Sequence, residues 1–107
     1  MRAWALLLLA AAPAAASEPD PDTRAALLAD GDAEWGAYLA GECTACHQGD
    51  GGAEGIPAIT GLPRDAFFDV MAAYKHKDLE HPVMTMVAGR LSYEEIAALA
   101  AYFEELQ

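Results

Sequence analysis

Positive charge is scarce in this sequence. Lysine and arginine together number 6, against 17 aspartate and glutamate residues, which gives a formal net charge of −11 at pH 7. The phosphates of a nucleic acid and the anionic headgroups of a membrane surface both attract basic faces. The composition therefore excludes both as partners, and it favours a protein that presents a basic docking patch.

Long apolar runs are also few. The longest, over residues 4–12, follows Arg2 and precedes the small residues Ala14, Ala15 and Ala16. It is well short of the roughly 20 residues that span a bilayer, and the pattern is typical of a secretory signal peptide. We predict cleavage after Ala16, export to the periplasm and no membrane span in the mature chain. No cysteine lies near the cleavage position, which excludes lipid attachment there.

Strand-like alternation and internal repeats are absent as well, so we predict an all-α fold. A chain of 107 residues suits one small domain. We predict a signal peptide over residues 1–16, an acidic, mobile lead-in over residues 17–31 with at most one or two helical turns, and a helical domain over residues 32–107. A mature chain this short often relies on a staple, metal or cofactor.

Three helices are predicted within this domain. The first spans residues 32–42 and is capped by Asp32. The second spans residues 64–75, and the last begins after Ser92, which forms a capping box with Glu95. Their apolar stripes are Trp35, Tyr38 and Leu39; Phe67, Met71 and Tyr74; and Ile96, Leu99, Phe103 and Leu106.

Glycine and proline interrupt the rest of the domain. Residues 49–61 are predicted as a glycine-rich loop and residues 75–82 as a polar loop, whereas residues 83–90 are too short and mixed to assign. Gly36 lies inside a predicted helix, where it costs about 1 kcal/mol relative to alanine. We expect it to be compensated by the close approach of another helix.

Cysteine occurs only as one pair, Cys43 and Cys46, which His47 follows directly. A disulfide would close too small a loop to stabilise much, a thioredoxin-like redox pair requires a βαβ setting, and zinc requires further ligands. Residues three and four apart share one face of a helical turn, so two thiols can add to the vinyl groups of a haem while the imidazole reaches the iron. This C-x-x-C-H motif predicts one covalent haem c, held through two thioethers.

The opposite face of the iron needs a second ligand. Met84 and Met86 lie just before the last helix and have nearly equal claims, whereas Met71 lies on an apolar stripe and is more simply a core residue. His76 and His81 lie in a charged loop, where a solvated imidazole is the usual state. A thioether ligand gives a higher reduction potential than a second histidine.

From about residue 32 onward the chain resembles the class I c-type cytochromes. The features that carry the resemblance are, in order, Gly36, Cys43-Thr44-Ala45-Cys46-His47, Gly49, Pro57, the methionine segment, Leu91-Ser92 and Ala101-Tyr102-Phe103. It implies a small cytochrome c fold of three to four helices around one haem. It also implies that the first and last helices cross near Gly36 and Tyr102 or Phe103, and that the Pro57 carbonyl accepts the proton of the His47 imidazole.

Within that family, the end of the chain is similar to the small cytochrome subunits of flavocytochrome c sulfide dehydrogenases. There the ligand methionine stands just before an Ile/Val-Ala pair, and Met84 stands before Val87-Ala88 in that register. This resemblance implies that Met84, rather than Met86, binds the iron. It also implies a flavoprotein dehydrogenase subunit as one partner.

The predicted function is the transfer of single electrons between redox proteins. The sequence shows no nucleophile, paired acids or open metal position, so we expect an electron carrier rather than an enzyme. We expect Leu39, Ile59, Phe67, Met71 and Leu99 to keep water from the haem, which raises its potential. The alternative is a haem-based sensor or binder of small ligands, with a labile sixth ligand.

Overall fold

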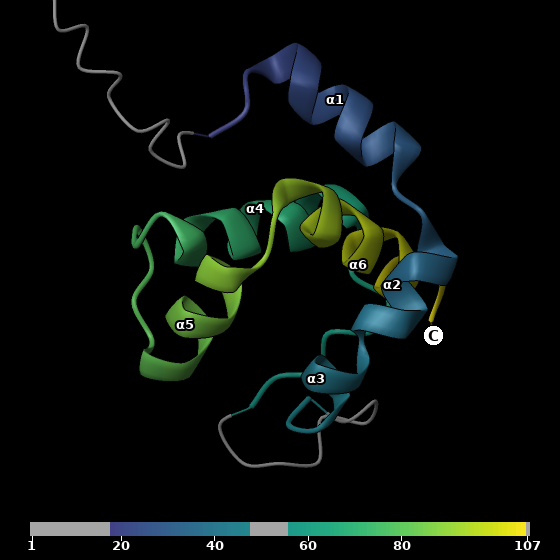
Figure 1. Ribbon diagram of the computed structural model, residues 1–107. Helices are drawn as coiled ribbons and strands as arrows, with labels where there is room; N and C mark the ends of the chain where they lie inside the picture. Colours follow the sequence, from purple (N-terminus) through teal and green to yellow (C-terminus); the bar gives the residue numbers. More distant parts are fainter. Residues whose placement is uncertain (1–17, 48–55, 107) are drawn as a thin grey trace, which may run out of the picture.

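A computed structural model of the chain describes residues 18–47 and 56–106 (Figure 1). The described residues are helical, without strands, so the predicted all-α fold class is confirmed. None of these helices is long and apolar enough to cross a membrane. The predicted signal peptide lies outside the described residues. The helices are α1 (Pro21–Asp30), α2 (Ala33–Leu39), α3 (Gly41–Thr44), α4 (Arg64–Lys75), α5 (Pro82–Arg90) and α6 (Tyr93–Glu105).

The last helix, α6, forms the centre of the fold and contacts α1, α2 and α4. Its first turn is closed by the predicted capping box: Glu95 N–H donates to Ser92 Oγ at 3.1 Å, and Ser92 N–H donates to Glu95 Oε1 at 2.9 Å. The helix is buried almost all round, because alanines fill the positions between its larger apolar side chains. The buried residues are Ile96, Ala97, Ala98, Leu99, Ala100, Ala101 and Phe103.

Gly36 of α2 lies directly against α6, as expected. A Cβ atom added at Gly36 would lie 2.1 Å from the carbonyl oxygen of Ala98 and 2.8 Å from the Cβ of Tyr102. Only a residue without a side chain fits such a contact between two helix backbones. The predicted crossing of these helices near Gly36 and Tyr102 is therefore confirmed.

Helix α4 begins and ends where the sequence predicts. Phe67 and Met71 are buried, and the ring of Phe67 stacks on that of Phe103 with centroids 5.5 Å apart. Tyr74, the third residue of the predicted stripe, is half-buried against the same core. The stripe thus packs α4 onto α6.

The predicted helix over residues 32–42 is divided into α2 and α3, with Ala40 between them. Asp32 caps α2 as predicted, since its Oδ1 accepts from the backbone N–H groups of Glu34 and Trp35. The apolar stripe is wrong at Tyr38, whose side chain is 84% exposed. Because Gly36 faces α6, a residue two positions further on points away from it.

The lead-in contains a longer helix than we predicted, and this helix packs on the domain. Helix α1 begins with Pro21 and is capped by the carboxylate of Asp20, which accepts from Thr23 N–H at 2.8 Å. Arg24 binds Asp69 of α4 at 2.8 Å. These contacts pack α1 against the other described helices, whereas we predicted a mobile lead-in over residues 17–31. The boundaries of the domain remain a prediction.

The segment left unassigned forms α5. Its first turn is capped by the imidazole of His81, whose Nδ1 accepts from Val83 N–H at 3.2 Å and Met84 N–H at 3.3 Å. Histidine is not among the usual N-cap residues, so this start gives no standard signal. Pro82 at the first helical position was the one indication in the sequence.

Candidate functional site

The two cysteines and the adjacent histidine lie on one continuous helical turn. The backbone N–H of His47 donates to the carbonyl of Cys43 at 2.7 Å, so the turn that begins in α3 extends through His47. Both cysteines are free thiols; Cys43 is half-buried and Cys46 is exposed. The spacing brings Cys43, Cys46 and His47 to the same side of the turn, as the motif predicts.

The surroundings of Cys43 disfavour its thiolate. Burial raises the pKa of this thiol above its ordinary value, and the neighbouring carboxylate of Glu42 raises it further. A reactive redox cysteine requires the opposite shift of its pKa. The residues that the structure describes also contain no group of three or more His, Cys, Asp or Glu side chains that could hold a metal.

His47 is held by a backbone carbonyl ten residues further along the chain. Its Nδ1 lies 2.8 Å from the carbonyl oxygen of Pro57. Because a carbonyl can only accept, Nδ1 carries the proton, and Nε2 keeps its lone pair for another partner. The hydrogen bond implied by the family resemblance is therefore present.

The segment that carries Pro57 is itself anchored to α6. Gly61 N–H donates to the carbonyl of Phe103 at 2.8 Å. Gly61 has a φ of +77°, a left-handed conformation that favours glycine. We did not predict this anchor, although a glycine followed by Leu62-Pro63 is a signal for a turn. This hydrogen bond holds the segment that carries Pro57 close to the core.

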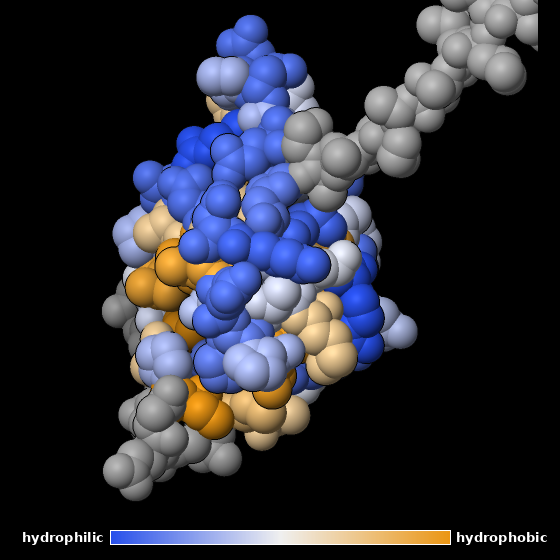
Figure 2. Space-filling view, turned by 90° about the vertical axis from the view of Figure 1, so that its left-hand side faces the viewer, coloured by the Kyte–Doolittle hydropathy of each residue, from blue (hydrophilic) through white to orange (hydrophobic). Residues whose placement is uncertain are grey.

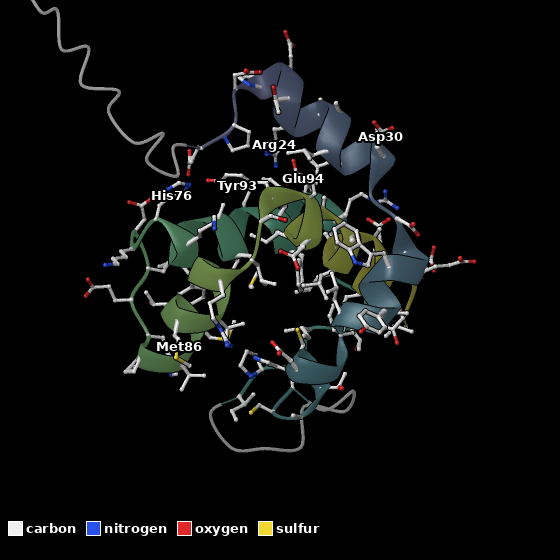
Figure 3. The ribbon with its side chains drawn as sticks, viewed as in Figure 1. Arg24, Asp30, His76, Met86, Tyr93 and Glu94 are labelled. Carbon is white, nitrogen blue, oxygen red and sulfur yellow. The ribbon has the colours of Figure 1, made fainter. Side chains whose placement is uncertain are left out.

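The two candidate methionines lie on different sides of α5. Met84 is half-buried and packs on the same core cluster as Cys43. Met86 is 56% exposed and lies on the outer side of the helix (Figure 3). Residues two apart on a helix point to different sides, so only one of the pair can face the core. Met71 is buried, in agreement with its predicted core position.

The face that carries α5 shows hydrophobic side chains among the charged ones (Figure 2). The large hydrophobic residues exposed in and just before α5 are Leu79, Val83 and Met86. Met86 thus belongs to the surface, and it is not a packing residue of the core.

The other two histidines have structural partners, whereas we expected both to be solvated. The Nε2 of His76 is hydrogen-bonded to the hydroxyl of Tyr93, and the two rings stack with centroids 5.9 Å apart. Figure 3 shows this pair beside the end of α4. His81 caps α5, as described above. Neither residue is grouped with Cys43 in the core cluster.

The side chains expected to exclude water lie in or on the core. Phe67, Met71 and Leu99 are buried, and Leu39 and Ile59 are partly buried and pack against the same core. The structure therefore provides an apolar surface next to Cys43 and Met84. Such a surface suits a flat, apolar group attached at the turn.

The chain is similar in sequence to a known protein. No family model matches the sequence. The chain is 34% identical over 91 residues to the thiosulfate dehydrogenase electron acceptor of Thiomonas intermedia (strain K12). The match covers 79% of this chain and 42% of the relative. The chain therefore spans less than half of the length of the curated relative that it matches.

Proposed function

We propose that this protein is a periplasmic monohaem c-type cytochrome that transfers single electrons between redox proteins. The observation that carries the proposal is the turn formed by Cys43, Cys46 and His47, with the His47 imidazole fixed by the Pro57 carbonyl at 2.8 Å. The predicted signal peptide supports export, which c-type haem attachment at this motif fits.

The residues present fit a covalent haem. Two free thiols lie one helical turn apart, and the imidazole beside them has a lone pair on Nε2. Bound there, a haem supplies an iron centre that gains and loses one electron. Cys43 and Cys46 would hold it, His47 would bind the iron, and the buried side chains around Phe67 and Met71 would exclude water.

Met84 is the second ligand in this proposal. Its half-buried position on the core shared with Cys43 supports it over Met86, which is exposed. A thioether on one side and an imidazole on the other favour ferrous iron more than two imidazoles do, so a relatively high potential is expected. His47 and Met84 would hold the iron together, and no open position for a substrate would then be left.

We further propose that the electron donor is a dehydrogenase acting on a reduced sulfur compound. The resemblance to sulfide dehydrogenase subunits and the name of the 34% identical relative both support this class of donor. A flavoprotein subunit is one form that such a donor can take. Anaerobic mixing with thiosulfate dehydrogenase and with a sulfide-oxidising flavocytochrome, each with its substrate, tests the donor; absence of reduction by both would contradict it.

Mass spectrometry of the exported protein tests the cofactor. We expect a chain that begins at Ser17 and carries the mass of one haem. Replacing both cysteines by alanine (Cys43→Ala with Cys46→Ala) should abolish the attachment, whereas Ala45→Ser in the same turn should retain it. An exported wild-type chain without haem would show that the proposal is wrong.

Spectroscopy tests the second ligand and the type of function. The ferric protein should show the far-red band of methionine ligation, lost in Met84→Ala and retained in Met86→Ala. Carbon monoxide should bind the reduced wild type slowly, because Met84 occupies the position it needs. Rapid binding would instead support a sensor of small ligands.

A further inference from the structure

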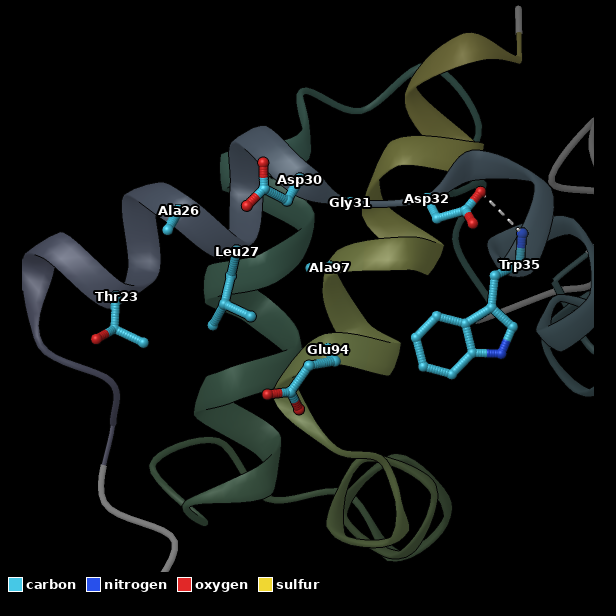
Figure 4. Close-up of a pocket in the computed structure, with 9 residues that line it drawn as sticks. All are labelled: Thr23, Ala26, Leu27, Asp30, Gly31, Asp32, Trp35, Glu94 and Ala97. Carbon is cyan, nitrogen blue, oxygen red and sulfur yellow. Dashed lines mark hydrogen bonds between the residues drawn. The ribbon is translucent and has the colours of Figure 1, made fainter.

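An open groove lies between α1, α2 and α6, away from the cysteine turn (Figure 4). Its volume is about 450 Å³. The floor is apolar and is formed by Ala26 and Leu27 of α1 and Ala97 of α6. The aromatic ring of Trp35, which is 40% exposed, forms one side. A partner that covers an exposed tryptophan and an apolar floor removes both from water, which favours binding.

Three carboxylates surround this floor. Asp32 is engaged as the cap of α2, and its Oδ1 accepts from two backbone N–H groups. The side-chain carboxylates of Asp30 and Glu94 have no hydrogen bond or ion pair with any other residue that the structure describes. The described residues form three ion pairs, in which arginines bind Asp69, Glu104 and Glu42 outside the groove. The groove thus combines an apolar floor, an aromatic side and uncompensated negative charge.

We propose that this groove is a docking site for an arginine-bearing segment of a basic protein partner. The alkyl part of an arginine can cover Leu27 and Ala97 while its guanidinium stacks on Trp35 and binds Glu94 or Asp30. The groove is the size of an anchoring pocket for one or two side chains, not of a whole interface. A net charge of −11 opposes pairing of two copies of this chain through the groove.

The position of the groove adds a consequence for electron transfer. In Figure 1, α1 and α3 lie on opposite sides of α6. A partner held at the groove therefore leaves the Cys43 side uncovered for exchange of electrons. This consequence rests on the proposed function, whereas the groove and its occupant do not.

Calorimetric titration of the protein as isolated tests the proposal. The probe is a helical peptide with two arginines one turn apart on an apolar face, and its control contains citrulline, which keeps the shape of arginine without the charge. We expect the arginine peptide to bind, the citrulline peptide to bind at least tenfold more weakly, and the affinity to fall as salt is added. Equal affinities for the two peptides would overturn the proposal.

Matched variants separate the groove from the net charge. Asp30→Asn combined with Glu94→Gln should weaken binding roughly tenfold, and Trp35→Leu should weaken it as well. Glu80→Gln combined with Glu105→Gln removes the same charge from exposed positions outside the groove and should change binding less than twofold. Circular dichroism of each variant checks that it folds. Equal effects of the two double variants would overturn the proposal, as would a dimer that forms through the groove in sedimentation.

The binding assay also keeps the two proposals distinguishable. Its readout is heat, and it does not depend on reduction of the protein. A chain that carries haem but fails to bind the arginine peptide contradicts the groove alone. A chain that binds the peptide but carries no haem contradicts the proposed function alone.

Discussion

The imidazole of His47 donates from Nδ1 to the carbonyl oxygen of Pro57 across 2.8 Å. The two residues lie ten positions apart in the chain, and the bond fixes both the tautomer and the orientation of the ring. A hydrogen bond of this kind makes the other ring nitrogen a stronger donor to a metal. It therefore links the geometry of one backbone carbonyl to the properties of the iron centre that we propose.

Replacing Pro57 should alter the reduction potential. Pro57→Gly frees the backbone that holds the carbonyl, so the His47 imidazole becomes a weaker donor and ferric iron is less stabilised. We expect an upward shift of less than about 60 mV, which corresponds to less than a tenfold change in relative affinity for the two oxidation states. Redox titration measures it. Pro63→Gly, in the same connection, serves as the control, and a downward shift in Pro57→Gly would contradict the mechanism.

Gly36→Ala should destabilise the fold. The new Cβ would lie 2.1 Å from the Ala98 carbonyl oxygen, so α2 and α6 must separate. We expect a loss of about 1–3 kcal/mol in the free energy of unfolding, measured with urea, in spite of the better helix propensity of alanine. Gly89→Ala is the matched control, because nothing lies within 4 Å of a Cβ at Gly89 in α5. That control should be neutral or stabilising; the same loss in both variants would refute the packing argument.

His81→Ala should destabilise helix α5 and therefore the position of Met84, which lies in its first turn. The imidazole Nδ1 accepts from two backbone N–H groups that alanine leaves without a partner. We expect a cost of about 0.5–2 kcal/mol in urea unfolding and earlier loss of the far-red band on heating. His81→Asn supplies another capping oxygen and should restore both. Failure of asparagine to restore either measurement would show that capping is not the role of His81.

Glu104 should stabilise the folded protein at neutral pH and should lose this effect at acid pH. The Arg64 backbone N–H, and then its guanidinium, hold the pKa of Glu104 below its ordinary value of 4.5. When folding lowers the pKa of a carboxyl group, its contribution to stability is complete above the pKa of the unfolded chain. That contribution is lost as the pH falls through the pKa of the folded state. The stability difference between wild type and Glu104→Gln should therefore shrink from neutral pH towards about pH 3. Urea unfolding across this range measures it; a constant difference, or the same trend in Glu105→Gln, would contradict the assignment.

The negative charge should govern encounter with redox reagents. A net charge of −11 attracts cations over a distance that salt shortens to about 10 Å at 0.1 M. Oxidation by a cationic cobalt complex should therefore slow as salt is added, whereas oxidation by ferricyanide should accelerate. Stopped-flow kinetics measures both rates. A salt dependence of the same sign for the two reagents would rule out steering by charge.

Signals between near neighbours in the chain predicted several elements well. The Ser92–Glu95 capping box, the Asp32 cap and the bounds of α4 depend on residues within one or two turns, so the sequence contains all that is needed. The spacing of Cys43, Cys46 and His47 belongs to the same class of signal. Helix α5 was missed because its cap is an imidazole, which is unusual in that position.

Other features depend on contacts between distant segments. Helix α1 is longer than its composition indicated because Arg24 meets Asp69 and the α1 backbone meets Arg64, which donates to the carbonyl of Leu28 at 2.8 Å. Met84 and Met86 had equal claims from position in the chain. Their burial differs because α5 turns one side towards the core.

The sequence by itself determined the spacing of Cys43, Cys46 and His47, the helical class and the overall charge, since each follows from residue types and short spacings. The resemblance to a family implied Met84 and the Pro57 carbonyl, but only the tertiary structure shows Met84 against the core, the Pro57 carbonyl beside His47, and a groove beside Trp35. The physical reason is that these features depend on how α1, α2, α4 and the loop pack on or near α6. Packing of distant segments is set by the shapes of all the buried side chains together, and no local pattern records it.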